Sequence, residues 1–144
     1  MSGDPFRLQR FVDAQTPVLD QVTSELAAGR KRTHWMWYIF PQLGGLGYSV
    51  MAKHFGIAGL PEAQAYLAHP ILSEHLQRCT QLAIDAPTAT LNALFGSPDD
   101  LKFKSSMTLF DIAANGQAFI FQEALDRWCG GAADERTLAL LAKA

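Results

Sequence analysis

The sequence has few cysteines, little net charge and no long apolar run, and each shortage excludes a class of protein. Its 144 residues include two cysteines, Cys79 and Cys129, which lie far apart and form no Cys-x-x-Cys pair. This spacing favours reduced thiols, as in the cytoplasm, over a disulfide framework. The formal net charge is −2 and the pI about 6.0. Binding of nucleic acid or of an anionic membrane normally needs a basic excess, so we expect neither partner.

Signals for membranes, secretion and common catalytic folds are also missing. No uninterrupted apolar stretch approaches the roughly 18 residues of a membrane span, and the start of the chain, Met1 to Pro5, lacks the basic-then-apolar pattern of a signal peptide. We therefore expect a cytoplasmic protein. The sequence contains no dinucleotide-binding, phosphate-loop, Gly-x-Ser-x-Gly or His-Glu-x-x-His motif. The four histidines include no convincing metal-binding pair, and we expect neither metal nor cofactor.

The residues that are present indicate a helical globular protein. Hydrophobic residues make up 49% and charged residues 18% of the chain, enough for a single globular domain over residues 1–144. Helix-start signals recur, with an N-cap residue, a proline at the first position, or both. They occur at Asp4-Pro5, Thr16-Pro17, Ser49, Pro70, Pro87-Thr88, Ser97-Pro98 and Asp134. No β-hairpin signal is found. The prediction is an all-α fold, a compact multihelical bundle of about eight short helices.

One aromatic run, from His34 to Gln42, is the most unusual stretch. It holds two of the three tryptophans, Trp35 and Trp37, and is followed by a loop with Gly45 and Gly47. Trp combines a large apolar body with a polar tip that needs a partner, and glycines let backbone approach backbone or a ligand closely. We expect a short buried helix ended by Pro41. The run either packs the core or also lines a site.

A second polar stretch, Lys102 to Thr108, interrupts an otherwise amphipathic helix. Its two lysines, Ser105, Ser106 and Thr108 are either solvated surface residues or donors to an anionic or sugar-like group. Lys102 and Ser106 are four residues apart and share a helical face. His75 lies on an apolar stripe and is interpreted as a satisfied core or boundary histidine.

Several of these segments together resemble an uncharacterised bacterial family, catalogued as domain of unknown function number 1810. The resemblance lies in the following segments: Arg30-Lys31, His34 to Gln42, Gly45-Leu46-Gly47, Glu62-Ala63, Tyr66-Leu67, His69-Pro70, Phe95-Gly96, Asp99-Asp100 with Lys102, and Ser105 to Phe110. It covers essentially the whole chain. It implies a compact all-helical fold and a set of family-like residues, without a mechanism.

A weaker resemblance is to the helical superfamily associated with NAD and ADP-ribose, which includes N-glycosidases. Met107, Phe110, Leu125, Gly130 and Asp134 follow the order of that superfamily's later residues. The glutamate of its Glu-His pair is absent, because a threonine precedes His34 in this sequence.

From these observations we expect a small protein that binds a nucleotide- or ribose-containing metabolite, with N-glycosidic hydrolysis as the concrete reaction. The expected roles are a base stacked on Trp35 or Trp37, a phosphate at Lys102, and a ribose oriented by Gln42 with Ser105 or Ser106, beside the Gly45–Gly47 loop. His34 and Asp111 are the candidate catalytic residues, because bond cleavage needs an acid or a stabilising charge.

The alternative is a non-catalytic helical interaction module that uses a Trp-rich surface as its anchor. The two hypotheses differ in geometry. If a binding site exists, Lys31, His34, Trp37, Gln42 and Lys102 should line one concavity. The oligomeric state is left open by the sequence.

Overall fold

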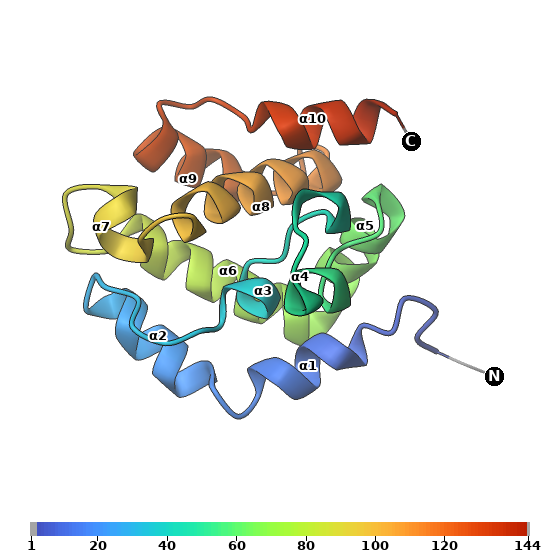
Figure 1. The fold of residues 1–144 in the computed structure, drawn as a ribbon, viewed down its shortest axis with the longest axis horizontal. Coiled ribbons are helices and arrows are strands. Elements are labelled where there is room, and N and C mark those ends of the chain that lie inside the picture. Colours follow the sequence, from blue (N-terminus) through green and yellow to red (C-terminus); the bar gives the residue numbers. More distant parts are fainter. Residues whose placement is uncertain (1–2, 144) are drawn as a thin grey trace.

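The computed structural model describes residues 3–143, so Met1, Ser2 and Ala144, at the ends of the expected domain, lie outside the described residues. Within them the chain forms ten α-helices and one short 3-10 helix, rather than about eight helices (Figure 1). The α-helices are α1 (Gln9–Gln15), α2 (Leu19–Ala27), α3 (Met36–Ile39), α4 (Val50–His54), α5 (Leu60–Ala68), α6 (Pro70–Ile84), α7 (Leu91–Phe95), α8 (Asp99–Ala114), α9 (Ile120–Cys129) and α10 (Glu135–Ala142), and the 3-10 helix is η1 (Gly44–Leu46). The described residues contain no strand, which confirms the all-α prediction. None of these helices is long and apolar enough to span a bilayer.

Helices α6 and α8 run through the middle of the molecule and the others pack around them (Figure 1). Helix α9 packs on both, α5 and α10 pack on α8, and α2 packs on α6. Buried side chains occur on nearly every side of α8 between Phe103 and Ala114. In that stretch Lys104, Asp111 and Ile112 are half-buried, and the other side chains are buried. Ser105, Ser106 and Thr108 are therefore buried, and their interpretation as surface residues is wrong.

Three helix starts, those of α4, α6 and α10, were predicted correctly, and a side chain caps each of them. Ser49 accepts a hydrogen bond from the Ala52 backbone N–H, and Asp134 accepts one from Thr137. Helix α6 begins at Pro70, as predicted, and the His69 ring nitrogen Nδ1 accepts the N–H groups of Ile71 and Leu72.

Four predicted starts were wrong. After Asp4-Pro5, α1 begins only at Gln9, although the Asp4 carboxylate accepts the backbone N–H groups of Leu8 and Gln9. The Thr16 hydroxyl donates back to the Val12 carbonyl at 2.7 Å, and α2 begins only at Leu19. Helix α7 begins after Thr90, whose hydroxyl accepts the Ala93 N–H, rather than at Pro87. Ser97 does not cap α8, which follows Pro98 without a side-chain cap.

The aromatic run forms α3 and its flanks, and its Trp35 and Phe40 rings pack with Phe95 and Phe103 in an aromatic cluster of the core. Trp35 and Phe40 are 1% exposed. The Phe40 ring lies edge-on to Phe103 with centroids 5.0 Å apart, and Phe95 stacks on Phe103 at 4.9 Å. The run ends its helix at Ile39, just before Pro41, as predicted. Its packing role is thus established for these side chains, while Trp37 is only half-buried.

The buried side chain of Gln15, at the end of α1, is hydrogen-bonded to α3, α5 and α6. The Gln15 side-chain amide donates to the Tyr38 carbonyl at 2.7 Å and to the Tyr66 hydroxyl at 2.9 Å. Its oxygen lies 2.8 Å from the His75 ring nitrogen, Nδ1. Because burial lowers the pKa of His75, the neutral ring with Nδ1–H as donor is favoured. The interpretation of His75 as a satisfied boundary histidine is confirmed.

Candidate functional site

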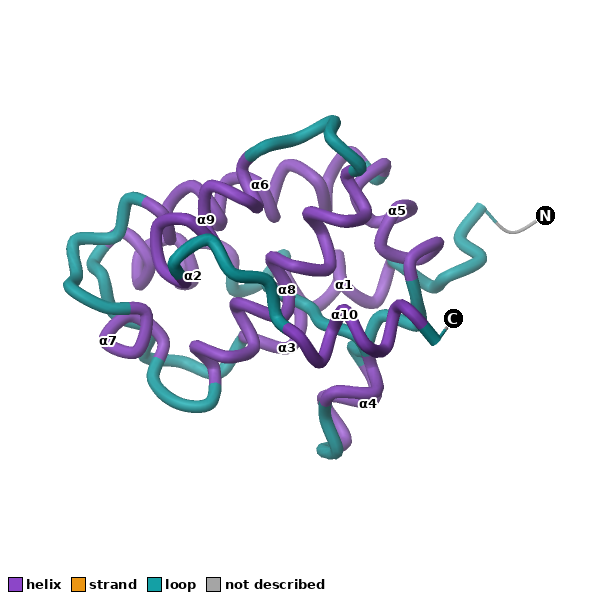
Figure 2. Tube along the Cα trace, turned by 90° about the horizontal axis from the view of Figure 1, so that it is seen from above, coloured by secondary structure: helices purple, strands orange, loops and turns teal. Residues whose placement is uncertain are grey.

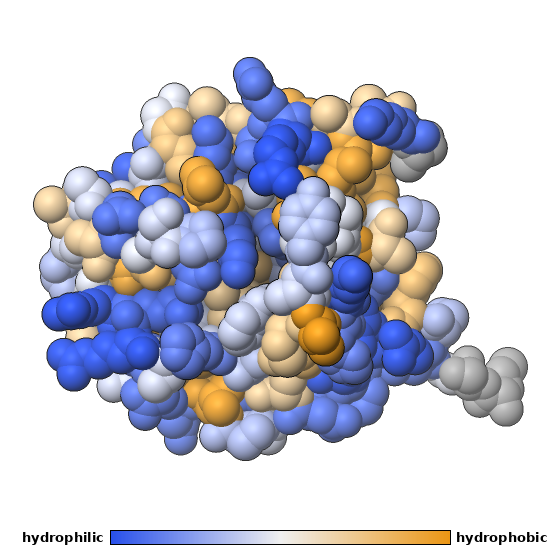
Figure 3. Space-filling view, in the orientation of Figure 1, coloured by the Kyte–Doolittle hydropathy of each residue, from blue (hydrophilic) through white to orange (hydrophobic). Residues whose placement is uncertain are grey.

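The site is a two-part hollow between α3, α4, α8 and the η1 loop. The inner chamber, of about 10 Å³, is lined by Met36, Trp37, Phe40, Gln42, Ala52, Phe55, Gly56 and Lys102. The outer cleft, of about 290 Å³, is lined by Gln42, Leu46, Gly47, Tyr48, Ser49, Ala52, Pro98, Leu101, Lys102, Ser105 and Arg136. Gln42, Ala52 and Lys102 border both, so the two parts lie side by side. Figure 3 shows the hollow in the middle of this face.

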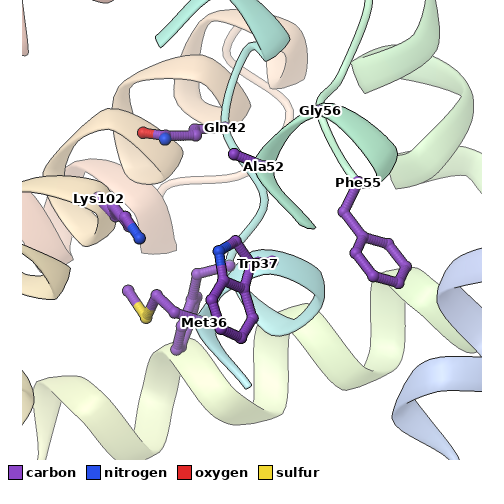
Figure 4. A pocket seen from close by; sticks show the side chains of 8 residues that line it. Met36, Trp37, Gln42, Ala52, Phe55, Gly56 and Lys102 are labelled. Atoms are coloured by element: carbon purple, nitrogen blue, oxygen red, sulfur yellow. The ribbon is translucent and has the colours of Figure 1, made fainter. Parts of the chain in front are cut away.

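The inner chamber has apolar walls and a polar rim. In Figure 4 the Lys102 side chain reaches toward Trp37 and Met36, while Gln42 comes from the loop above them. The Lys102 ammonium lies 5.5 Å from the centre of the Trp37 ring, within the range of a cation–π contact. A volume near 10 Å³ is about that needed for one water molecule. The chamber is therefore too small for a planar ring.

Close backbone packing shapes the loop that carries Gln42. Leu43 and Ile57 form an isolated parallel bridge, in which the Ile57 N–H donates to the Gln42 carbonyl at 2.9 Å. A Cβ at Gly56 would overlap the Gly44 backbone, and one at Gly47 would lie 2.5 Å from the Ala52 Cβ. Gly56 and Gly47 therefore allow close packing of these segments against Gly44 and Ala52. The bridge fixes the Gln42 backbone, and its side-chain amide has no hydrogen bond among residues 3–143.

Glu25 fixes the other end of the aromatic run. It is 4% exposed, and its two oxygens accept five hydrogen bonds. The donors are the backbone N–H groups of Arg32 and Thr33, the Thr33 hydroxyl, the Gln21 amide and the Trp35 indole. Burial alone would raise the pKa of Glu25, but the hydrogen bonds outweigh it and hold the pKa at about 2. Glu25 is a structural carboxylate whose oxygens are already occupied.

Charge in the site is positive. Lys31 and Lys102 share one carboxylate, with Nζ–Oδ distances to Asp99 of 2.9 and 3.5 Å. One acid between two lysines leaves a net positive charge. Arg136, from α10, adds a second cation to the cleft and donates to the Leu46 carbonyl at 3.4 Å. None of the residues that line the chamber or the cleft is acidic.

The structure brings together only part of the set predicted from the sequence. Trp37, Gln42 and Lys102 line the chamber, and Gly47 and Ser105 join them along the cleft. The Ser105 hydroxyl donates to the Leu101 carbonyl at 3.1 Å, which leaves its oxygen as an acceptor.

The other predicted residues lie elsewhere, for identifiable reasons. Lys31 is buried in its ion pair with Asp99, and His34 is exposed on the loop before α3, so the prediction that both line the concavity is wrong. Trp35 is a core residue bonded to Glu25. Gly45 is exposed beside Leu140, at a different hollow.

Ser106 and Asp111 also lie outside the cavity linings. Ser106 is fully buried, and its hydroxyl has no partner among the described residues. Asp111 follows Lys102 by nine residues, which at 100° each places it on the opposite side of α8. Burial, together with the Asp126 charge, raises the pKa of Asp111. Residues 3–143 contain no cluster of His, Cys, Asp or Glu that could hold a metal ion.

Sequence reasoning missed Tyr48, Leu101 and Arg136. Arg136 lies on the last helix, and no periodicity or motif connects it with Lys102. Tyr48 immediately follows the glycine loop, and Leu101 immediately precedes Lys102, so proximity to residues already selected was the available signal.

Comparisons with known proteins support the same fold. The family model described as "Protein of unknown function (DUF1810)" matches residues 5–141. The conserved hypothetical protein Rv1873 from Mycobacterium tuberculosis, which has a crystal structure, is 52% identical in sequence to this chain. The two structures have a TM-score of 0.93, over 96% of this chain and 99% of that one. The search of curated proteins found no match.

Proposed function

This chain belongs to the DUF1810 family, and we propose that its cleft binds a small phosphorylated metabolite of the nucleotide or ribose-phosphate type. The observation that carries the proposal is the lining of the cleft, which combines two cations with neutral donors and no acid. We place this activity in the cytoplasm, where the free thiols Cys79 and Cys129 would stay reduced.

The charge distribution favours an anionic group at the centre of the cleft. Lys102 borders both the chamber and the cleft, and Arg136 approaches from α10. Lys102 is held only loosely by Asp99, at 3.5 Å, because Asp99 makes its shorter contact with Lys31. An arriving phosphate can therefore take over Lys102 without leaving Asp99 unpaired. Arg and Lys together suit phosphate, through bidentate and point-charge contacts.

Neutral groups beside these cations suit the hydroxyls of a ribose. The Gln42 amide carries both donors and an acceptor and is unoccupied among the described residues. Ser49 accepts the Ala52 N–H and keeps its own proton to donate. Few, well-placed polar groups in a mostly apolar hollow are typical of metabolite sites.

The proposal is limited to binding because the residues that line the chamber and the cleft include no histidine and no carboxylate. General acid–base catalysis needs a suitable side chain within hydrogen-bond reach of the reacting group. His34 and Asp111, the candidates for a hydrolytic step, line neither the chamber nor the cleft. The interaction-module alternative needed a Trp-rich surface. Trp35 is 1% exposed and Trp37 lines the chamber, so these two side chains form no such surface.

Ligand-induced stabilisation tests the proposal. ADP-ribose, NAD and ribose 5-phosphate would each be added to the parent protein in a thermal unfolding assay. A ligand at 100 times its dissociation constant stabilises the fold by about 2.7 kcal/mol, which is a shift of several degrees for a chain of this size. Lys102→Ala and Gln42→Ala should lose the shift while keeping nearly the parent melting temperature, because both side chains are only partly buried.

Lys104→Ala is the matched control. Lys104 is the same residue type on the same helix, makes no ion pair among residues 3–143, and lines neither the chamber nor the cleft. It should keep the full ligand shift. If no compound shifts the parent, or if Lys104→Ala reduces the shift as much as Lys102→Ala, the proposed function is wrong.

A further inference from the structure

We propose that Tyr48 and Leu101 form an aromatic–aliphatic clamp at the mouth of the cleft, which selects ligands that carry a planar ring next to their phosphate. This inference rests on the proposed function and narrows its ligand class to nucleotides, in place of plain sugar phosphates. It also places the ligand's ring against Tyr48 at the mouth of the cleft, whereas the sequence analysis expected that ring to stack on Trp35 or Trp37.

The first observation is that both side chains are exposed although they line the cleft. Tyr48 is 85% exposed and Leu101 is 61% exposed. Tyr48 lies between η1 and α4, while Leu101 lies in the first turns of α8, so the two approach the cleft from separate parts of the chain. In Figure 2, α4 stands out from the other helices on the face that carries the cleft. Large apolar groups left uncovered at the rim of the cleft would gain burial from a bound ring.

The second observation is that a ring has no place deeper in the site. The inner chamber holds about 10 Å³, and its walls include Phe40, which is 1% exposed and packed on Phe103. The Trp37 ring is already in contact with the Lys102 ammonium. Trp35 is enclosed in the core. Of the two parts of this site, the outer cleft, at about 290 Å³, is the one with space for a heterocycle.

The third observation is the spacing between the clamp and the cations. Leu101 and Lys102 are consecutive, so their Cα atoms are about 3.8 Å apart. Both side chains line the cleft, so a nucleotide can set its base against Leu101 and its phosphate against Lys102. Tyr48 makes no hydrogen bond and no ring contact among residues 3–143, so its ring can turn onto the ligand. With two side-chain torsions, it does so at low entropic cost.

Calorimetric titration with paired ligands tests the clamp. AMP, UMP and FMN would be compared with ribose 5-phosphate, which offers the same sugar and phosphate without a ring. Stacking on an aromatic side chain tolerates different bases and strengthens binding by roughly tenfold or more. The parent should therefore bind the ring-bearing compounds at least tenfold more tightly than ribose 5-phosphate.

Variants at the mouth separate stacking from charge. Tyr48→Ala should weaken binding of the ring-bearing compounds roughly tenfold and leave ribose 5-phosphate unchanged. Tyr48→Phe keeps the ring face and should bind like the parent. Val50→Ala is the control, because Val50 is 84% exposed close to Tyr48 but does not line the cleft.

The outcomes distinguish this inference from the proposed function. If ribose 5-phosphate binds as tightly as the nucleotides, or if Tyr48→Ala weakens all ligands equally, the clamp is refuted and the anion site stands. If no compound binds the parent, the proposed function fails and the clamp with it. A ring preference that disappears in Tyr48→Ala and persists in Tyr48→Phe and Val50→Ala would support the clamp.

Discussion

Along α8, burial decides what each polar side chain can do. Lys102 reaches the cleft, and the Ser105 hydroxyl donates to the preceding turn while facing the cleft. Thr108 donates to the Lys104 carbonyl and accepts the Asp134 N–H, which links α8 to the start of α10. Ser106 is fully buried, and its hydroxyl has no partner among residues 3–143. Similar residue types in one short stretch therefore have four different environments. Sequence spacing predicted which of them share a face, but not what packs against that face.

Ser106→Ala should stabilise the protein by about 0.5–1 kcal/mol. The change removes a buried hydroxyl without a partner and replaces it with the best helix former. Thr108→Val is the matched comparison, because it removes a hydroxyl that is bonded on both sides, and it should destabilise by about 1–3 kcal/mol. Urea unfolding of the two variants and the parent measures both effects. Equal destabilisation by both substitutions would mean that Ser106 has a hydrogen-bond partner after all.

Among the elements, several helix starts could be predicted from capping residues and prolines. The contact between two backbone segments at the Leu43–Ile57 bridge could not. Ser49, Pro70 and Asp134 marked helix starts correctly, since their caps depend on local sequence. The bridge between Leu43 and Ile57 joins segments that carry no strand pattern. It forms because glycines on both sides allow the two backbones to meet, and such a meeting depends on the tertiary fold. The glycine loop was recognised, but its partner segment was not.

Gly56→Ala should therefore destabilise the protein by about 1–3 kcal/mol, the usual cost of forcing an extra methyl group into a packed site. The added Cβ would overlap the Gly44 backbone, and a backbone cannot turn away as a side chain can. Gly45→Ala is the control in the same region, because its Cβ would make only an ordinary 3.4 Å contact with Leu140. The melting temperatures of the two variants check this. A loss in Gly45→Ala as large as in Gly56→Ala would contradict the proposed steric cause.

For the whole molecule, the fold class followed from the sequence more completely than the site did. Repeated caps and the absence of hairpin signals were enough for an all-α prediction. The site needed distant segments to meet, and the mixture of Trp, Gln and Lys pointed to Trp37, Gln42 and Lys102, which line one chamber in the structure. Arg136 was missed because its position in the cleft depends on how α10 packs on α8. The predictions for Lys31 and His34 were wrong because no sequence feature showed their surroundings. Lys31 is buried in an ion pair with Asp99, and His34 is exposed on the loop before α3.

The same loop, residues 30–35, connects α2 to the core through Glu25, and we expect that connection to control the acid stability of the whole molecule. The pKa of Glu25 in the folded protein is about 2, below its ordinary value of 4.5. A lowered pKa means that the ionised form stabilises the fold at pH values above the ordinary pKa. That contribution should be lost as the pH falls from about 4.5 toward 2.

Glu25→Gln should lower the free energy of unfolding at pH 7 by about 2–4 kcal/mol, because an amide nitrogen would face N–H donors that now share a carboxylate. Its stability should then fall less steeply than that of the parent between pH 4.5 and pH 2. Glu74→Gln is the control, since Glu74 is about half exposed in a surface ion pair with Arg78 and should change stability little. Urea unfolding at pH 7, 4.5 and 3 measures all three proteins. If the parent and Glu25→Gln lose stability in parallel as the pH falls, Glu25 is not the carboxylate that links this fold to pH.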